Sequence, residues 1–233
     1  MKRILVCEDE DSIREFVVLN LKRSGYEVVD VNCGEKAIEA FDRENGRFDI
    51  ALLDIMMPVI DGFGVCKALR ERSDTLGVIM LSAKSQEMDK VSSLMMGADD
   101  YITKPFSISE LIARVDAVYR RVSRSSSRNE KQELITSGPF AIDMKSRVLV
   151  KNGNPVDLTQ VEFQIMEYFL KNPNTALDRV SILHHIWGEN YYGDEKIVDV
   201  NIRRIRMKIE DNPSEPEYLT TVWGYGYKWN SAG

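Results

Sequence analysis

The sequence predicts an α/β protein in two parts, a doubly wound parallel sheet of five strands followed by a smaller α+β domain. In the first half, short apolar runs alternate with stretches whose apolar residues recur at helical spacing, the pattern of a parallel sheet covered by helices. In the second half, short strand signals separated by turns accompany three helical stretches. Residues 122–133 are polar and without periodicity, which indicates a flexible linker between domains at 1–121 and 134–230.

Composition is that of a soluble protein with two modest domains, because the 233 residues are 43% hydrophobic and 29% charged. No apolar run is long enough to span a bilayer, and the first residues lack a signal-peptide pattern, so we expect a cytoplasmic protein without a membrane partner. Neither a Walker A loop nor a dinucleotide-binding glycine fingerprint occurs. Three cysteines without Cys-x-x-Cys spacing are expected to be thiols in a reducing compartment: Cys7, Cys33 and Cys66.

The elements of the first domain follow from this alternation. The apolar run at residues 50–53 is of strand length and unbroken by polar side chains, as in a strand buried on both faces. Gly97 is expected to close one helix, and Ser107 with Glu110 is a capping box that begins another. Strands are expected at residues 4–7, 26–31, 48–53, 78–81 and 100–102, and helices at 12–24, 35–43, 62–72, 86–96 and 107–121.

Carboxylates follow two of these strands at the point where each strand ends. Asp54 follows the run at 50–53, and Glu8 and Asp9 follow the first strand. In open α/β sheets, reaction sites lie outside the carboxyl ends of the strands. Adjacent carboxylates repel each other unless a cation lies among them. A site of carboxylate oxygens with few protein ligands suits magnesium. The alternative is that the acids at 8–11 cap the following helix, and one of the four is expected to do so.

Two further strand ends carry polar groups, Ser82 and, just beyond the last strand, Lys104. Together the four positions predict phosphoryl chemistry, in which Asp54 attacks phosphorus and Mg²⁺ held by Glu8, Asp9 and Asp54 offsets the charge of the phosphoryl oxygens. Lys104 and Ser82 would bind the other oxygens. The Lys-Pro-Phe turn fits a cis peptide bond between Lys104 and the proline after it.

These residues resemble the receiver domain of two-component response regulators over residues 1–121. The resemblance implies that a histidine kinase transfers a phosphoryl group to Asp54, that the main-chain carbonyl of Met56 is an additional metal ligand, and that Ser82 and Tyr101 form a switch. Many relatives carry threonine at the position of Ser82. The motifs that carry the resemblance are Glu8-Asp9, Asp54 to Pro58, Asp61-Gly62, Ser82 to Lys84, Gly97 to Tyr101 and Lys104 to Phe106.

The second domain begins with short strands at residues 140–142, 148–151 and 156–158. Asn152-Gly153 is a strong hairpin signal. Thr159 with Glu162 is a capping box for a helix that ends at residue 170. Further helices are expected at 179–187 and 195–210, with a loop at 188–193 between them and a glycine-containing hairpin at 219–229 at the end.

The helix at 195–210 has the features of a DNA recognition helix. Its apolar spacing predicts a buried stripe of Val198, Ile202, Ile205 and Ile209. Arginines would contact phosphates and guanine edges, and Val200 a thymine methyl. The alternative is an ordinary solvated face, and the charge from residue 134 onward, 11 Lys and Arg against 13 Asp and Glu, does not favour DNA. The opposite side of the helix is expected to expose Lys196, Val200, Arg203, Arg204 and Met207, with Arg206 on its flank.

Residues 134–230 resemble the winged helix-turn-helix domain of the OmpR/PhoB class. The resemblance implies promoter DNA as a partner and adds Asn201 and Trp223 to the candidate contacts; many relatives have arginine at Trp223. It also implies a phosphorylation-dependent homodimer. The cross-subunit pairs carried over are Lys90 with Glu110, Asp100 with Arg114, and Asp99 with Arg121. The alternative is that these are solvated ions, each contributing less than about 1 kcal/mol.

The sequence therefore predicts a cytoplasmic bacterial response regulator that is not an enzyme and whose partners are a sensor histidine kinase, double-stranded promoter DNA and RNA polymerase. Two other classes were weighed. An aspartyl phosphatase of the dehalogenase type needs a second acid two residues after the nucleophile, where this chain has Met56. A phosphorylation-independent or RNA-binding regulator would not need the full set of acids with Ser82 and Lys104.

Overall fold

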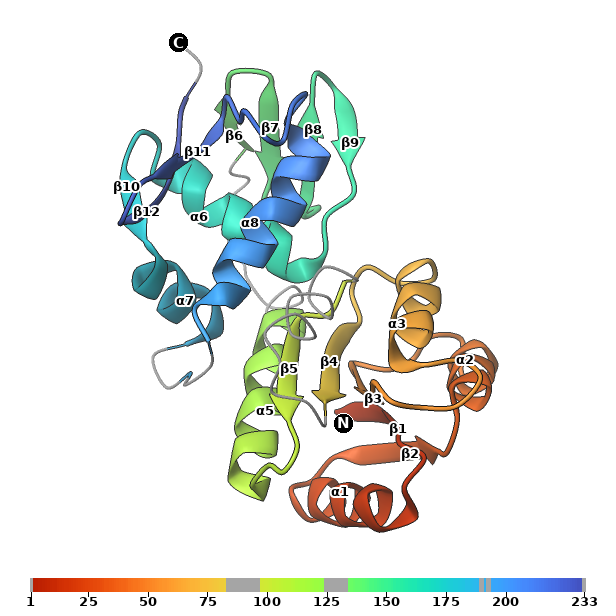
Figure 1. The fold of residues 1–233 in the computed structure, drawn as a ribbon. Helices are drawn as coiled ribbons and strands as arrows, with labels where there is room; N and C mark the ends of the chain where they lie inside the picture. Colours follow the sequence, from red (N-terminus) through yellow and green to blue (C-terminus); the bar gives the residue numbers. More distant parts are fainter. Residues whose placement is uncertain (1, 83–96, 124–133, 189–190, 192–193, 232–233) are drawn as a thin grey trace. The chain divides into compact units, whose positions relative to one another are not determined.

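The computed structural model describes residues 2–82, 97–123, 134–188, 191 and 194–231. The chain divides into two compact units, Met1–Val122 and Ser123–Gly233 (Figure 1). Each unit has a hydrophobic core of its own. Among the residues described, no helix is both long and apolar enough to cross a membrane.

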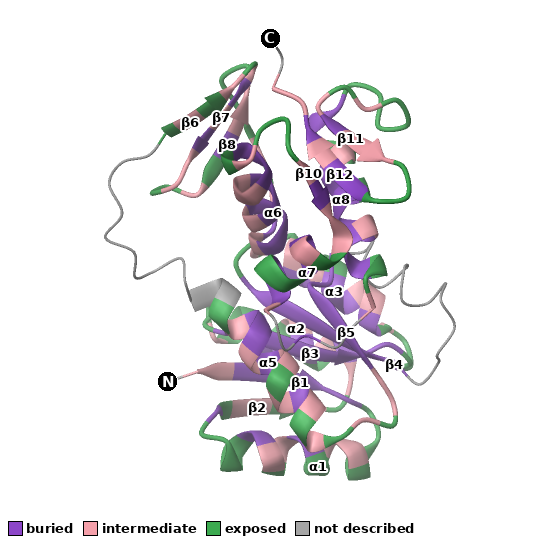
Figure 2. Ribbon diagram, turned by 90° about the vertical axis from the view of Figure 1, so that its left-hand side faces the viewer, coloured by how far each residue is buried: buried purple, intermediate pink, exposed green. Residues whose placement is uncertain are grey.

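The first unit is a five-stranded parallel sheet, as the sequence predicts, and its strand order is β2-β1-β3-β4-β5. The central strands β3 and β4 are buried along their whole length, and Figure 2 shows this burial across the middle of the sheet. The strands are β1 (Arg3–Cys7), β2 (Glu27–Val31), β3 (Ile50–Asp54), β4 (Gly77–Ser82) and β5 (Asp100–Thr103).

Helices cover both faces of this sheet. Alternate strand residues such as Val6 and Leu52 form one core cluster with Leu21 of α1 and Val115 of α5, so these two helices share a face. The helices α2 and α3 pack on the other face (Figure 1). The helix expected at 86–96 lies outside the described residues. The bounds are α1 (Asp11–Arg23), α2 (Gly34–Arg43), α3 (Gly62–Arg70) and α5 (Ile108–Ser123).

The helix ends differ from expectation in two places. None of the acids at 8–11 caps α1 through its side chain: the N-cap residue Glu10 makes no such bond, and its carboxylate accepts instead from the Ser12 hydroxyl. At α5, the Ser107 hydroxyl accepts from the Glu110 backbone N–H (3.1 Å) as expected, but the Glu110 carboxylate accepts from Arg114 rather than completing a capping box. Because α5 continues to Ser123, the first two residues of the expected linker are helical, and residues 124–133 lie outside the described part.

The second unit contains two antiparallel sheets. One has the strand order β6-β7-β8-β9 and the other β10-β12-β11. The sequence did not predict β6, which directly follows the polar linker, or β10, which has only three residues. The bounds are β6 (Leu134–Ser137), β7 (Phe140–Asp143), β8 (Val148–Lys151), β9 (Asn154–Val156), β10 (Ala176–Asp178), β11 (Leu219–Val222) and β12 (Gly226–Trp229).

The Asn152-Gly153 turn explains why β9 begins earlier than expected. Both turn residues have positive φ (52° and 79°), and Lys151 pairs directly with Asn154. A two-residue hairpin loop of this kind lets the returning strand begin at once. The strand therefore starts at Asn154 rather than at residue 156.

Three helices complete the second unit: α6 (Gln160–Lys171), α7 (Arg179–Trp187) and α8 (Lys196–Ile209). The capping box of α6 is present, because the Thr159 N–H donates to the Glu162 carboxylate (2.8 Å) and the Glu162 N–H to the Thr159 hydroxyl (3.4 Å). Apolar side chains of α6 and the buried indoles of Trp187 and Trp229 form much of the core.

Candidate functional site

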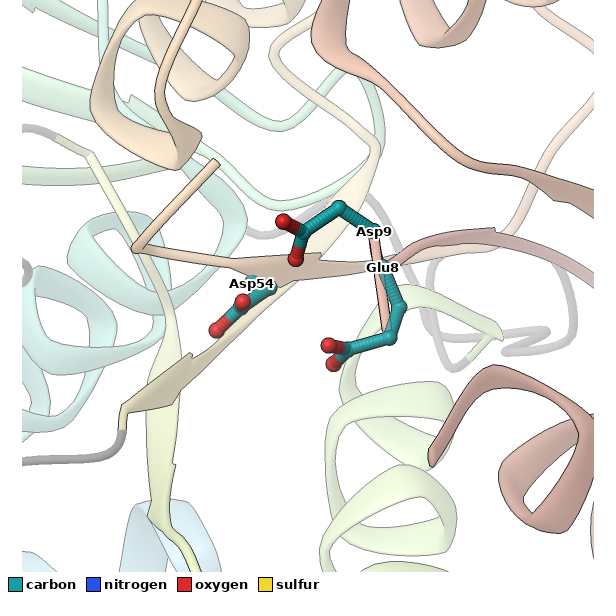
Figure 3. A group of neighbouring side chains, drawn as sticks. All are labelled: Glu8, Asp9 and Asp54. Carbon is teal, nitrogen blue, oxygen red and sulfur yellow. The ribbon is translucent and has the colours of Figure 1, made fainter. Parts of the chain in front are cut away.

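Three carboxylates converge where two neighbouring strands of the first unit end. Glu8 and Asp9 follow β1, and Asp54 is the last residue of β3; because these strands are adjacent and parallel, their carboxyl ends meet at one edge of the sheet. One carboxylate oxygen from each residue lies within 4.8 Å of the others. Figure 3 shows the three side chains as neighbours at this edge. Glu8 and Asp54 are buried and Asp9 is exposed. The sequence expectation that these three acids form one cluster is confirmed.

Lys104 brings a cation into this cluster. Its ammonium nitrogen lies 2.7 Å from a carboxylate oxygen of Glu8 and 3.0 Å from Asp54 Oδ1. The Lys104–Pro105 peptide bond is cis, as the sequence favours, and the Lys104 N–H donates to the carbonyl of Ser82 (2.6 Å). Burial acts to lower the pKa of Lys104, but the hydrogen bonds and negative charges of Glu8 and Asp54 outweigh it and raise that pKa. The side chain is therefore a charged ammonium directed at Asp54.

The environment of Glu8 fits a bound cation. Burial raises the pKa of its carboxyl, and the hydrogen bond from Lys104 offsets this only in part. Among the described residues, no donor reaches Glu8 Oε1, although this atom is buried. A buried carboxylate oxygen without a donor is costly unless another group satisfies it. Together with Asp9 and Asp54, it offers the oxygen ligands that Mg²⁺ prefers.

Ser82 and Tyr101 lie on the neighbouring strands β4 and β5, but only Ser82 is at the carboxyl end of its strand. Ser82 ends β4 and Tyr101 is in β5, where it pairs with Met80. Both side chains are buried, with exposed fractions of 3% and 5%. Met56 lies two residues beyond β3 with an exposed side chain. Direct contacts place Lys104 at the acids, and Ser82 ends the strand next to β3, whereas the role of Tyr101 stays a prediction.

Four of the six residues expected to form a dimer interface are described with their side chains, and these four have partners within this chain. Arg114 lies 3.1 Å from the buried carboxylate of Asp100 and 3.0 Å from Glu110. Asp99 is paired with Arg70 (2.6 Å), which the sequence did not single out, and accepts from the Val78 N–H. Of the other two expected residues, Lys90 lies outside the described residues, and so does the side chain of Arg121.

The expected exposed face of α8 is partly wrong. The stripe of Val198, Ile202, Ile205 and Ile209 is buried as predicted. Val200 and Arg204 are buried too, with exposed fractions of 5% and 7%, and Asn201 is completely buried. The reason is that α8 contacts both α6 and α7, so that more than one stripe is covered. Arg204 reaches inward to Glu162 (2.8 Å), and the Asn201 amide donates back to the Ile197 carbonyl.

Arg206 is used inside the domain as well. Its guanidinium donates to the carbonyl of Leu219 (2.8 Å) and to the hydroxyl of Thr221 (2.9 Å), both in β11. It thereby fastens the C-terminal hairpin to α8. Of the seven predicted DNA contacts, three remain exposed: Lys196, Arg203 and Trp223.

Comparisons with known proteins agree with this arrangement. Residues 4–116 match the family model described as "Response regulator receiver domain", and residues 153–229 match "Transcriptional regulatory protein, C terminal". The sensory transduction protein RegX3 of Mycolicibacterium smegmatis is 41% identical over 228 residues, which cover 98% of this chain and 99% of RegX3. The chain belongs to the OmpR/PhoB class of response regulators. It is thus a transcriptional regulator of a two-component system, a class whose partners are a histidine kinase and DNA.

Two other relatives match along their whole length. YcbL of Bacillus subtilis, an uncharacterized transcriptional regulatory protein, is 41% identical over 225 residues, covering 96% of this chain and 98% of YcbL. The crystal structure of the response regulator DrrB of Thermotoga maritima, whose title calls it an OmpR/PhoB homologue, has a TM-score of 0.50 and 31% identity over 99% of both chains. Receiver domains bind Mg²⁺ in an acidic pocket, and this chain has an acidic cluster of Glu8, Asp9 and Asp54.

Two residues beside the receiver pocket were not predicted to act there. Arg14 of α1 donates to the main-chain carbonyl of Glu8 (2.8 Å) and pairs with Asp11, which holds the loop after β1. At Gly62, a Cβ atom would lie 2.2 Å from the carbonyl oxygen of Asp54. The sequence signal was present for Gly62, because Asp61-Gly62 is part of the receiver motif, but the close approach to Asp54 depends on the fold.

Glu162, like Arg14 and Gly62, has a role that the sequence did not predict. Besides capping α6, its buried carboxylate pairs with Arg204 (2.8 Å) and Lys208 (2.7 Å) of α8. Burial acts to raise the pKa of Glu162, but the charges of the two cations outweigh it and hold the pKa below its ordinary value. A single carboxylate therefore joins the start of α6 to α8.

Proposed function

We propose that Asp54 accepts the phosphoryl group from the histidine kinase. The observation that carries the assignment is the convergence of Lys104, Glu8 and Asp9 on the buried carboxylate of Asp54. A carboxylate oxygen of Asp54 bonds to phosphorus while the bond between phosphorus and the kinase histidine nitrogen breaks. Lys104 and the Ser82 hydroxyl bind the phosphoryl oxygens. Glu8, Asp9, Asp54 and the main-chain carbonyl of Met56 would hold Mg²⁺, which would offset the negative charge of the transferred group.

Replacing Asp54 with asparagine is expected to abolish labelling by acetyl phosphate in the presence of magnesium, because the amide is not a nucleophile toward phosphorus. The gain in mass of the intact protein measures the labelling. Asp61→Asn is the matched control: Asp61 caps α3 from the next loop and asparagine caps equally well, so its labelling should equal that of the parent. Labelling of Asp54→Asn at the parent level would remove Asp54 from this role.

We infer that phosphorylation acts through Ser82 and Tyr101 on the surface formed by β5 and α5, and that this surface forms a two-fold homodimer. Every contact in a two-fold interface occurs twice, so that weak pairs add up. In the dimer, Asp100 would pair with Arg114 of the second chain instead of with Arg114 of its own chain. Arg114 would likewise pair with Asp100 of the second chain. The positions of Asp100 and Arg114 support this. Asp100 lies in β5 and Arg114 in α5, the described elements that come after β4, the strand that Ser82 ends.

A mixing experiment distinguishes pairs within one chain from pairs between chains. Arg114→Asp and Asp100→Arg each place like charges opposite one another, so neither variant should dimerise alone after phosphorylation. In an equimolar mixture, both cross-subunit pairs are restored, whereas both pairs within each chain stay repulsive. We expect sedimentation to detect dimers only in the mixture. Circular dichroism checks that both variants fold, and folded variants that stay monomeric when mixed would contradict the interface.

For the second unit we propose that α8 lies in the major groove of promoter DNA, with Lys196 and Arg203 contacting phosphates or base edges. Val200, Asn201 and Arg204 are not retained as contacts because they are buried. The dimer would bind two spaced half-sites, and the DNA-bound regulator would contact RNA polymerase. Phosphotransfer from a kinase and access to promoter DNA together favour a cytoplasmic protein.

A further inference from the structure

Arg70, the last residue of α3, bonds to three acceptors at the amino ends of β4 and β5. Its guanidinium donates to the main-chain carbonyls of Leu76, just before β4, and of Gly97, shortly before β5. It also pairs with the carboxylate of Asp99 at 2.6 Å, and the two side chains are only 11% and 4% exposed. Hydrogen bonds that involve charged groups are short and strong. One buried cation therefore fastens the end of α3 to the starts of two strands.

The amino ends of β4 and β5 are also joined to each other. The Asp99 carboxylate accepts from the Val78 N–H (2.7 Å), and the Asp99 N–H donates to the Val78 carbonyl (2.8 Å). Gly97 packs closely on Arg70, because a Cβ atom there would lie 3.1 Å from Arg70 Cγ, and its φ of 110° disfavours any side chain. Hydrogen bonds and close packing thus hold both strand ends around Arg70.

The other end of α3 lies against the phosphoacceptor strand. The helix begins at Gly62, where a Cβ atom would lie 2.2 Å from the Asp54 carbonyl oxygen. With nine residues and a rise of about 1.5 Å per residue, α3 is about 13 Å long. A short helix that contacts the sheet at both of its ends is a rigid spacer between Asp54 and the amino ends of β4 and β5.

The carboxyl ends of β4 and β5 lie at the acids instead. Ser82 ends β4, and Lys104 directly follows β5. The Lys104 N–H donates to the Ser82 carbonyl (2.6 Å), and the Lys104 ammonium pairs with Asp54 (3.0 Å). Because β3, β4 and β5 are parallel, the ends that Arg70 holds lie at the opposite edge of the sheet. A displacement caused by a phosphoryl group on Asp54 therefore begins at one end of the two strands, while Arg70 holds the other.

We propose that Arg70 is a positioning residue for the phosphorylation switch. It fixes the amino ends of β4 and β5 against α3, so that a phosphoryl group on Asp54 displaces their carboxyl ends together with α5. Close-packed elements pass such displacements on because they move between discrete arrangements instead of deforming continuously. The inference rests on the proposed phosphorylation of Asp54 and on the proposed dimer of the β5 and α5 surface. It gives α3, which lies outside that surface, a role in its response.

The gain in dimerisation on phosphorylation measures this role. Sedimentation of the full chain gives the dimer dissociation constant before and after treatment with acetyl phosphate and magnesium. We expect a gain of at least about tenfold in the parent. Arg70→Met fills the same space without hydrogen-bond donors, and its gain should fall below about threefold. The mass of the intact protein should show labelling of Asp54 at the parent level, because the acids lie at the opposite edge of the sheet.

Three further variants separate this role from a general loss of stability. Arg72→Met is the matched control, because Arg72 follows α3 and pairs with Asp42 at the surface; its gain should equal that of the parent. Gly97→Ala presses on Arg70 without removing it and should lower the gain. Arg70→Lys keeps the charge but cannot reach all three acceptors, so its gain should be intermediate. If Arg70→Met does not fold, as judged by circular dichroism, Gly97→Ala and Arg70→Lys decide the result.

Failure of this inference is distinguishable from failure of the proposed function. If the parent dimerises on phosphorylation and the folded Arg70 and Gly97 variants gain as much, the dimer stands and the role of Arg70 is wrong. If Arg70→Met is no longer labelled, Arg70 shapes the phosphoacceptor pocket instead, which also overturns the inference. A parent that is not labelled, or is labelled without any gain in dimerisation, would contradict both.

Discussion

Glu162→Gln is expected to destabilise the DNA-binding unit by about 3–5 kcal/mol. Glutamine can still cap α6, but it removes the negative charge that lies 2.8 Å from the guanidinium of Arg204, a side chain that is only 7% exposed. Breaking a buried ion pair by removing one partner has this cost because the remaining charge is not solvated. Tryptophan emission during urea unfolding measures the effect in this unit alone, since all three tryptophans lie between Trp187 and Trp229.

Glu167→Gln provides the control for this substitution. Glu167 also lies in α6 and pairs with Lys171 one turn away, whose side chain is 37% exposed, so loss of this pair should cost less than about 1 kcal/mol. The contribution of Glu162 also depends on pH. Its pKa in the folded protein lies below the unfolded value of 4.5, so the stabilisation is complete above about pH 4.5 and is lost as the pH falls through the folded pKa. Equal stability of Glu162→Gln and the parent at neutral pH would show that Arg204 needs no counter-charge.

Gly62→Ala is expected to disrupt the pocket of Glu8, Asp9 and Asp54, because the new methyl group would lie 2.2 Å from the Asp54 carbonyl oxygen and 2.9 Å from the Ile55 Cα. These are backbone atoms, so α3 or the end of β3 must move. We expect a loss of about 1–3 kcal/mol, typical of overpacking, together with slower labelling of Asp54 by acetyl phosphate. Thermal unfolding followed by circular dichroism and the labelling rate provide the two measurements.

Gly64→Ala is the matched control in the first turn of the same helix. Its nearest neighbour would be the end of the Ile60 side chain at 3.0 Å, which can rotate away, and alanine is the better helix former. Its stability should stay within about 1 kcal/mol of the parent and its labelling rate should be unchanged. If Gly62→Ala behaved in the same way, the close approach to Asp54 would have no part in shaping the pocket.

The receiver site was predictable because it depends on topology alone. Parallel strands bring their carboxyl ends to one edge, so Glu8, Asp9 and Asp54 had to meet once the alternation of strands and helices was recognised. The positions of Ser82 and Lys104 followed for the same reason. The short strands β6 and β10 were missed because three or four residues without alternation carry almost no signal.

The recognition helix was harder to predict. A helical projection of the sequence does not show which arginines have a partner elsewhere in the fold. Arg204 has a buried partner in Glu162, more than 40 residues earlier in the chain. The same is true of Arg206, whose acceptors in β11 are known only from the fold. Asp99 is a similar case in the receiver, since the family resemblance supplied a partner in another subunit whereas Arg70 pairs with it within the chain.

The affinity of the full chain for a DNA duplex that it selects from random sequence, measured before and after treatment with acetyl phosphate and magnesium, tests the central claim most directly. We expect phosphorylation to tighten binding at least about tenfold in the parent, equivalent to about 1.4 kcal/mol and within the usual range of allosteric coupling. Asp54→Asn should bind with the affinity of the untreated parent under both conditions. An Asp54→Asn variant whose affinity rises as much as the parent's on treatment would contradict control of DNA binding through Asp54.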